Sequence, residues 1–179
     1  EYCFDIHPNS HNYAVILYGR AFLFDHEKPK FKKELTGHNE EVSSIQYINN
    51  GRELITTGFD NTARIWDAEK RKQVLVLQGH TSQINEVDIN DSLIFTLSSD
   101  NSIKIWKYPE GDLVASFYAF LDDRYFIVTP DDYYIGSKSV IRSLSYKIAD
   151  TLFPFEQFDL IYNRPDIVLE RLGYASPEL

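Results

Sequence analysis

The sequence lacks several features that would direct its chemistry or its location. It has a single cysteine, Cys3, so no disulfide can form within the chain, which is typical of a reducing compartment and favours a cytoplasmic protein. It contains no methionine, even at position 1, and it opens in an apolar segment, so we expect a piece of a longer polypeptide. The longest apolar runs, such as residues 13–18, are far shorter than the roughly 20 residues that a membrane helix needs. We therefore expect no membrane partner.

Basic charge is also scarce. The 18 lysines and arginines are outnumbered by 27 aspartates and glutamates, which gives a net charge of -9. A surface of this sign repels a phosphate backbone, so nucleic acid is not an expected partner. Cys3, His7 and His11 are ligand-type residues, but they form an irregular set without the four well-placed ligands of a structural zinc site. We expect a strand-to-strand turn there, no metal and no cofactor.

Two segments of the chain repeat each other. Residues 37–67 and 79–107 both begin with Gly-His and both reach a Trp near their end, at an offset of 42 residues at the start and 40 at the Trp. Within each copy, short runs of alternating polarity are separated by turn clusters rich in Asn and Asp. Each copy predicts three strands up to its Trp, followed by a fourth at residues 73–77 or 113–118. Four antiparallel strands form one blade of a β-propeller.

The segments on either side of the repeats give weaker signals. Upstream, three β-rich runs between residues 3 and 25 follow the same rhythm and predict a degenerate blade. Downstream, residues 125–129 and 133–136 flank a Pro-Asp-Asp turn and predict a hairpin. Beyond the hairpin, the spacing of Val140, Ile141, Leu144 and Ile148 predicts a helix. Asn163 with Asp166 resembles an N-cap pair that opens a second helix, which runs through Leu172 and stops at Gly173.

The predicted fold is therefore mostly β: a partial β-propeller of about three four-stranded blades plus a hairpin, with a small helical C-terminal tail. We divide it into residues 1–118, which hold the blades (1–36 degenerate, 37–78 and 79–118 clear), and residues 119–179, which hold the hairpin and the helical tail. Propellers close with about four to eight blades. Three blades leave an open edge, which we expect to be covered by the tail, by self-association with a second copy, or by further blades of a longer protein.

The two repeats resemble the WD-repeat family. The residues that carry the resemblance are Gly37, His38, Asp60, Trp66 and Asp67 in the first copy and Gly79, His80, Asp100 and Trp106 in the second, where Lys107 replaces the family's Asp. The resemblance implies one buried hydrogen-bonded tetrad in each blade, formed by His38, Thr56, Asp60 and Trp66 and by His80, Thr96, Asp100 and Trp106. A His, a hydroxyl and an Asp could also suggest hydrolysis. We interpret the set as satisfying buried polar groups, and we expect no catalytic residue.

The same resemblance implies a scaffold that binds a protein or peptide rather than an enzyme. It assigns the exposed upper-face positions to six residues: Glu41, Ser43, Phe59, Gln83, Asn85 and Ser99. Phe59 is the strongest candidate, because exposed aromatic residues often dominate the binding energy of an interface.

The tail carries a second resemblance. Residues 133–179 are similar to the segment that joins WD repeats to a caspase-like cysteine peptidase domain in certain bacterial proteins, mainly through residues 153–160 and 163–169. This implies an alternative role as a sensor and linker that regulates a peptidase domain located after Leu179, because the catalytic Cys and His of such a domain are not in this sequence. A plainer interpretation is that Phe153, Phe155 and Phe158 pack the tail against the blades.

Overall fold

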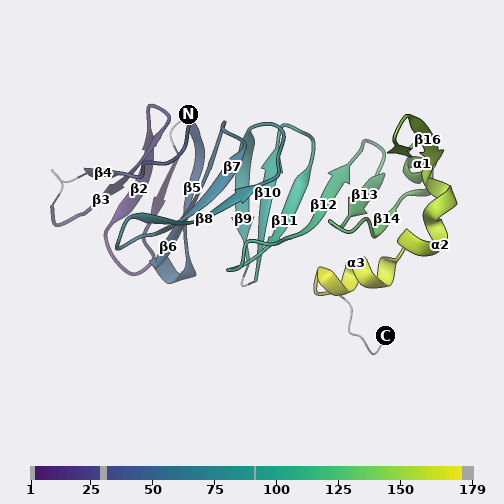
Figure 1. Cartoon of the computed structure of the whole chain (residues 1–179). Helices are drawn as coiled ribbons and strands as arrows, with labels where there is room; N and C mark the ends of the chain where they lie inside the picture. The colour runs from purple at the N-terminus through teal and green to yellow at the C-terminus, as the bar shows by residue number, and fades with distance from the viewer. Residues whose placement is uncertain (1–2, 29–31, 91, 175–179) are drawn as a thin grey trace. The chain divides into compact units, whose positions relative to one another are not determined.

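The computed structural model describes residues 3–28, 32–90 and 92–174, and most of its elements are antiparallel β-strands (Figure 1). The chain divides into two compact units. The first comprises Glu1–Asp100 and Tyr108–Gly111, and the second comprises Asn101–Lys107 and Asp112–Leu179. The division that we predicted at residue 118 stays a prediction, and each unit is described by itself.

The first unit begins with a four-stranded antiparallel sheet, which is the predicted degenerate blade. Its strands are β1 (Phe4–Ile6), β2 (Tyr13–Leu17), β3 (Arg20–Phe24) and β4 (Lys32–Glu34), in that order. Tyr18 and Gly19 connect β2 to β3, and both have a positive φ, of 52° and 72°. Positive φ at both residues of a two-residue loop is the type I′ geometry, which matches the twist of a hairpin.

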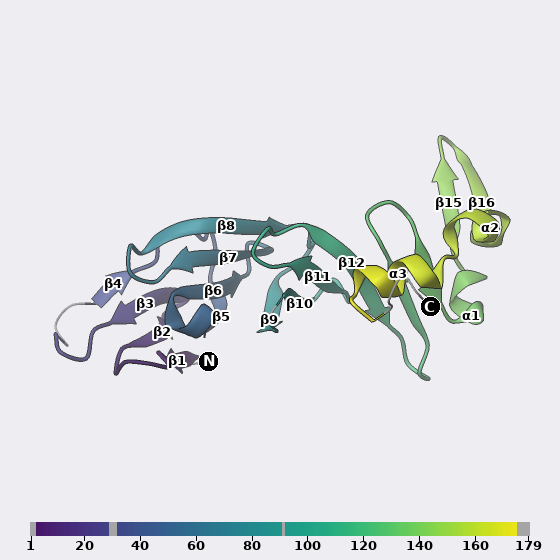
Figure 2. The same cartoon turned by 90° about the horizontal axis from the view of Figure 1, so that it is seen from below.

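The first clear repeat forms the second blade. Its strands are β5 (Val42–Ile48), β6 (Glu53–Gly58), β7 (Thr62–Asp67) and β8 (Lys72–Gln78), again in sequence order (Figure 2). A short 3-10 turn, η1 (Asn49–Gly51), joins β5 to β6. The unit then continues with the antiparallel pair β9 (Ile84–Ile89) and β10 (Leu93–Ser98). These strands lie where the repeat pattern predicts them.

Hydrogen bonds between neighbouring blades follow the sequence period. The Asp5 carboxylate accepts from the backbone N–H of Tyr47 at 2.6 Å, and these residues are 42 positions apart. The Ser43 hydroxyl donates to the carbonyl oxygen of Ile84, 41 positions further along. The first strand of each blade therefore contacts the first strand of the next. The offset of 40 to 42 residues seen in the sequence is the distance along the chain from one blade to the next.

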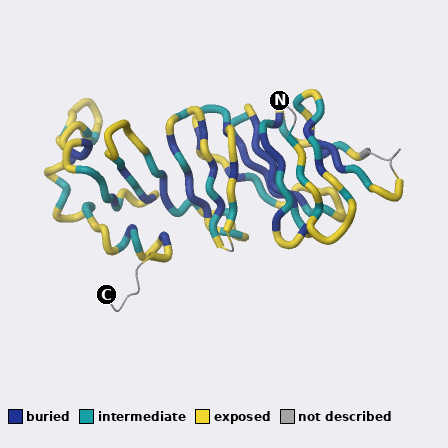
Figure 3. The backbone as a smooth tube through the Cα atoms, turned by 180° about the vertical axis from the view of Figure 1, so that it is seen from behind, coloured by how far each residue is buried: buried dark blue, intermediate teal, exposed yellow. Residues whose placement is uncertain are grey.

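A core cluster of the first unit lies between the first two blades. Ala14, Ile16 and Leu23 from the first blade pack in one cluster with Leu54 and Trp66 from the second, and all five are almost fully buried. Figure 3 shows the buried residues following the strands, with exposed residues mainly in the connections. Burial of each large apolar side chain stabilises the fold by roughly 1.5–3 kcal/mol, so this contact orients one blade on the other.

The opposite face of the first blade is apolar, and the described residues of the first unit leave it exposed. Successive side chains on a strand point to opposite faces, so Tyr13 points away from the core that holds Ala14. Tyr13 pairs with Phe24 across the sheet as Leu54 pairs with Trp66 in the second blade. Phe4 and Ile6 on β1 extend this face and are 64% and 59% exposed. The second blade packs on the first with the face that carries Leu54 and Trp66. The first blade exposes the equivalent face, which carries Tyr13 and Phe24.

The second unit contains four antiparallel strands in sequence order, then short helices and one more hairpin. The strands are β11 (Ile103–Lys107), β12 (Leu113–Ala119), β13 (Tyr125–Val128) and β14 (Tyr134–Gly136), so the predicted hairpin is present and extends the sheet of β11 and β12. The elements that follow are α1 (Lys138–Ile141), β15 (Ser145–Ile148), β16 (Thr151–Pro154), η2 (Phe155–Phe158), α2 (Asp159–Tyr162) and α3 (Pro165–Arg171). No helix in the described part of the chain is both long enough and apolar enough to cross a membrane.

Two expectations for the tail were wrong in detail. The helix predicted from Val140 to Ile148 ends after Ile141, and Ile148 lies in β15, which pairs with β16. Ser143 Oγ donates to the carbonyl oxygen of Val140 at 2.7 Å, and such local side-chain bonds compete with helix continuation. The last helix does end before Gly173, whose φ is +80°, but its N-cap is Arg164 and not Asn163, with Pro165 as its first residue.

Aromatic side chains hold the tail together within the second unit. The ring of Phe155 is stacked on that of Tyr146, with ring centroids 4.1 Å apart, and it also packs against Phe126 of β13 and Tyr134 of β14. The Tyr134 hydroxyl donates to the Asp159 carboxylate. Of the three phenylalanines that we expected to pack the tail, Phe155 is therefore the one buried in its core.

Candidate functional site

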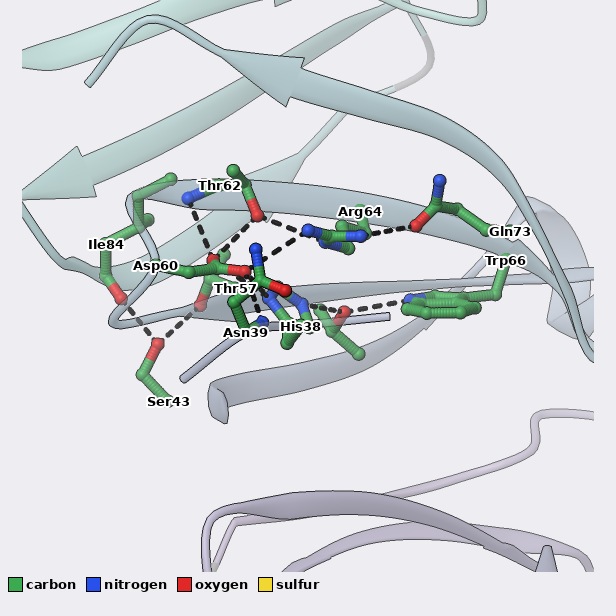
Figure 4. A network of polar contacts seen from close by, with 11 residues as sticks. His38, Asn39, Ser43, Thr57, Asp60, Thr62, Arg64, Trp66, Gln73 and Ile84 are labelled. Carbon is green, nitrogen blue, oxygen red and sulfur yellow. Dashed lines mark hydrogen bonds and ion pairs between the residues drawn. The ribbon is translucent and has the colours of Figure 1, made fainter. Parts of the chain in front are cut away.

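A chain of buried polar groups runs across the second blade. His38 Nε2 lies 2.8 Å from the hydroxyl oxygen of Thr56 on β6, and the same oxygen accepts a hydrogen bond from Trp66 Nε1 on β7 at 2.8 Å. His38 Nδ1 lies 3.0 Å from both carboxylate oxygens of Asp60, which belongs to the turn between β6 and β7. Figure 4 shows His38 between Asp60 and Trp66, with these contacts as dashed lines. The structure thus brings together the four residues of the first predicted tetrad.

The direction of each hydrogen bond follows from what each group can offer. The Trp66 indole can only donate, so Thr56 accepts its hydrogen and uses its own hydroxyl hydrogen elsewhere. That hydrogen is donated to His38 Nε2, which leaves Nδ1 as the protonated nitrogen that donates to the Asp60 carboxylate. The neutral form of His38 with its proton on Nδ1 therefore gives each of the four side chains a hydrogen-bond partner.

Asp60 accepts more hydrogen bonds than any other member of the network. Besides His38, the backbone N–H of Asn39 donates to it at 3.0 Å, the Thr62 hydroxyl at 2.7 Å and the Arg64 guanidinium at 3.2 Å. Burial raises the pKa of Asp60, but the hydrogen bonds from Thr62, Asn39 and His38 outweigh it and lower the pKa to about 2. The carboxylate is therefore ionised at neutral pH and fixes the loop before β5 to the turn after β6.

Burial also lowers the pKa of His38, and this effect exceeds the opposing influence of the Asp60 carboxylate. The side chains of His38 and Asp60 are only 3% and 5% exposed. A histidine that acts as a general base must reach the proton that it removes. Both ring nitrogens of His38 are already engaged by Asp60 and Thr56, so the geometry favours a structural network over catalysis.

Arg64 and Thr62 extend the network beyond the residues that we predicted. Arg64 Nε donates to the Thr62 hydroxyl at 3.2 Å, and Arg64 Nη1 donates to Gln73 Oε1 on β8 at 2.6 Å. A signal for both residues is present in the sequence, where Thr62 and Arg64 alternate with the apolar residues Ala63 and Ile65. This alternation places Thr62 and Arg64 on the same strand face as Trp66.

The second copy repeats the arrangement within the first unit. His80 Nδ1 lies 2.8 Å from Asp100 Oδ2, and His80 Nε2 lies 2.8 Å from the Thr96 hydroxyl oxygen. The backbone N–H of Thr81 donates to Asp100 at 3.0 Å, as that of Asn39 does to Asp60. Trp106, the last predicted member, is buried on β11 in the second unit.

The network positions a surface at the ends of the strands. The backbone N–H of Phe59, next to Asp60, donates to the carbonyl oxygen of Glu41 at 2.8 Å, and the N–H of Val42 donates to that of Gly19 at 2.8 Å. Four chain segments meet there around a hollow of about 560 Å³, and nine residues line it: Ile16, Tyr18, Gly19, Glu41, Val42, Ser43, Phe59, Gln83 and Asn85. We call this hollow and its lining the Phe59 surface.

Five of the six predicted partner-binding residues line the Phe59 surface: Glu41, Ser43, Phe59, Gln83 and Asn85. The sixth, Ser99, accepts a hydrogen bond from Asn85 Nδ2 at 2.9 Å and so lies beside it. Phe59 is 39% exposed, whereas Ser43 is tied to the Thr57 hydroxyl at 2.9 Å and to Ile84. Tyr18, which is 96% exposed, was missed. Its signal is a Tyr-Gly pair between two short β-rich runs.

The ligand-type residues near the N-terminus are separated by their packing. The ring of His7 lies against Tyr47, with centroids 5.0 Å apart, whereas His11 lies beside His26. Within the described ranges, no group of three or more His, Cys, Asp or Glu residues is arranged to hold a metal ion. The segment between His7 and His11 forms part of the turn from β1 to β2.

Removal of the Thr56 hydroxyl tests the network directly. We expect Thr56→Val to lower the free energy of unfolding by roughly 1–3 kcal/mol, because Trp66 Nε1 and His38 Nε2 then lose their shared partner in a buried site. Urea unfolding gives the measurement. The control is Thr36→Val, the same change at an exposed residue, which we expect to be nearly neutral. Equal losses for the two variants would contradict the network.

The pKa values of His38 and Asp60 predict loss of stability in acid. Both are lower in the folded state than their ordinary values of 6.5 and 3.8, so the unfolded chain binds protons more readily. The contribution of His38 is present above pH 6.5 and is lost as the pH falls below it, and that of Asp60 is lost between pH 3.8 and about 2. We expect the urea midpoint to fall between about pH 7.5 and about pH 5.5.

His38→Gln should make this dependence on pH weaker, whereas His11→Gln, a change at an exposed histidine, should leave it as in the parent. An unchanged pH dependence in His38→Gln would assign the acid sensitivity to other groups.

Comparison with known proteins agrees with this geometry. The family model "WD domain, G-beta repeat" matches residues 29–67 and 71–107. The chain is 28% identical over 46% of its length to eukaryotic translation initiation factor 3 subunit I of Eremothecium gossypii, and 31% identical over 47% to THO complex subunit 3 of Arabidopsis thaliana. Mitochondrial division protein 1 of Coccidioides immitis is 27% identical over 62% of the chain.

The matched part covers only 25%, 29% and 15% of the length of these three relatives, respectively. The similarity therefore concerns the repeats rather than whole proteins. The repeat offset, the stacked blades and the match to the family model all apply to the same residues. Residues 29–67 and 71–107 of this chain are therefore two WD repeats.

Proposed function

We propose that the chain is a protein-interaction scaffold and that the Phe59 surface binds a protein or peptide partner. The observation that carries the proposal is an exposed aromatic ring on a turn that a buried network holds in place. Phe59 is 39% exposed, and its neighbour Asp60 is fixed by His38, Thr62 and the backbone of Asn39. A ring that is already positioned loses little conformational entropy on binding, which favours affinity.

The family supports this role in general terms. Two of the relatives are named as subunits, one of a translation initiation factor and one of the THO complex, so each belongs to an assembly. Repeat folds of this kind present rigid surfaces on which connecting loops make the contacts. The Phe59 surface includes three such connections, namely the turn of Tyr18, the loop before β5 and the turn after β6.

The role as a linker that regulates a caspase-like peptidase domain stays a narrower prediction. It depends on the resemblance of residues 153–160 and 163–169, which fall in β16, η2, α2 and α3 of the second unit. The relatives named above are eukaryotic and give no support for a bacterial source. A coding sequence that continues past Leu179 into a domain with its own His and Cys would support this role.

We also propose that the chain self-associates through the exposed apolar face of the first blade. Phe4, Ile6 and Tyr13 lie on this face, which corresponds position by position to the face of the second blade that is buried in the core. Contiguous apolar surface of this kind marks an interaction site. In a larger WD-repeat protein, which we also predict, a further blade would cover the same face.

Sedimentation velocity over a range of protein concentrations tests the self-association. We expect the parent chain to form dimers as its concentration rises, and Ile6→Lys to stay monomeric because a charge then enters the contact. Val74→Lys is the matched control, since Val74 on β8 and Ile6 are both 59% exposed. A parent chain that remains monomeric at every concentration, or dimers that Ile6→Lys leaves intact, would contradict the proposal.

Substitution of Phe59 tests the scaffold function. We would select peptides from a displayed random library against the whole chain and measure their affinity for Phe59→Ala. Loss of a hot-spot aromatic costs about 2 kcal/mol or more, so we expect affinity to fall roughly thirtyfold. The control is Phe120→Ala, because Phe120 is exposed to a similar degree, at 44%. Selected peptides that bind both variants as tightly as the parent would rule out the Phe59 surface.

A further inference from the structure

We propose that the Phe59 surface accepts a cationic side chain, the lysine or arginine of a peptide, between the rings of Tyr18 and Phe59 and the carboxylate of Glu41. The inference rests on the proposed function of this surface, and it specifies the chemistry of the partner.

The charge of the surface has one sign. Among the nine residues that line the hollow of the Phe59 surface, the charged residue is Glu41, which is negative. An adjoining hollow of about 390 Å³ shares Tyr18, Gly19, Glu41 and Val42 with it and adds Glu34 and Glu40. Arg20 also lines this second hollow, but it is paired with Glu34 at 3.3 Å. In the part of the chain that the structure describes, neither Glu40 nor Glu41 forms an ion pair, so their negative charge is available to a ligand.

The two rings add an attraction that is specific for cations. Tyr18 is 96% exposed, so its ring is not needed for the core. Its φ of 52° lies in the left-handed region, where glycine and asparagine are favoured and tyrosine is uncommon. A Lys or Arg side chain placed over an aromatic ring is attracted by its π electrons, and the planar guanidinium of Arg can also stack on the ring. Rings and a carboxylate around one hollow thus form a site suited to a cation.

The backbone holds these groups in place. A Cβ atom built on Gly19 would lie 2.6 Å from Glu41 Cγ, so the Glu41 side chain packs directly over the backbone of the Tyr18 turn. The Val42 N–H donates to the Gly19 carbonyl oxygen, and the Phe59 N–H donates to the Glu41 carbonyl oxygen, both at 2.8 Å. Tyr18, Glu41 and Phe59 therefore belong to three segments linked by hydrogen bonds. The backbone that carries the three side chains is preorganised, which lowers the entropy cost of binding.

Matched peptides with the whole chain test the proposal. The probes are an array of short peptides in which one central position is Arg, Lys, Gln, Leu or Glu and the flanking positions are randomised. We expect the chain to bind the Arg and Lys sets more tightly than the Gln set. This binding should weaken as salt is added. Glu41→Gln and Tyr18→Ala should each reduce affinity for the Arg set roughly tenfold, while Tyr18→Phe keeps its ring and retains binding.

The control is Glu110→Gln, which removes the same charge at an exposed glutamate outside the Phe59 surface and should bind as the parent does. Urea midpoints equal to that of the parent establish that each variant is folded. If the Leu, Gln or Glu sets bind best and their binding depends on Phe59, the cationic specificity is wrong and the scaffold function stands. If no set binds in a manner that depends on Phe59, both proposals are overturned.

Discussion

The carboxylate of Asp60 is the constraint on which the described surface depends. It lies in a turn, yet it accepts hydrogen bonds from His38, from the backbone of Asn39 and from Thr62 and Arg64. A buried charge is costly unless it is paired and hydrogen-bonded, and Asp60 meets both conditions. Because its partners include His38 and Asn39, this single side chain ties the loop before β5, which lies outside the strand ladders, to the turn between β6 and β7.

The rigidity of the blade is what suits the Phe59 surface to binding. Phe59 precedes Asp60, and its N–H is bonded to Glu41, so the polar network inside the blade sets the geometry outside it. The stacking of blades then places Tyr18 of the preceding turn at the same hollow. Structural and binding roles are thus divided between neighbouring residues: one side chain points inward and satisfies buried groups, and the next is exposed to a partner.

Much of the fold and part of the candidate site could be predicted from the sequence, because the signals there are local and repeated. The Gly-His and Trp positions indicated the blades, and the pairing of His38 with Asp60 followed from the family resemblance. The helix predicted across Ile148 failed because apolar residues spaced for one helix face also serve in short strands when β16 is available to pair. Tyr18 was missed because nothing local indicates that its turn meets Glu41, which lies 23 positions away in the sequence.

The sequence by itself determined the repeat, the strands of the blades and the identity of the polar residues that they bury, since these depend on alternation, turn chemistry and a period near 40 residues. The tertiary structure alone decided which exposed residues share a surface and which apolar face stays uncovered. The physical reason is that the hollow around Phe59 forms where separate segments of the chain meet. The packing of Ala14, Ile16 and Leu23 against Leu54 and Trp66 brings these segments together, and no property of a single segment does so.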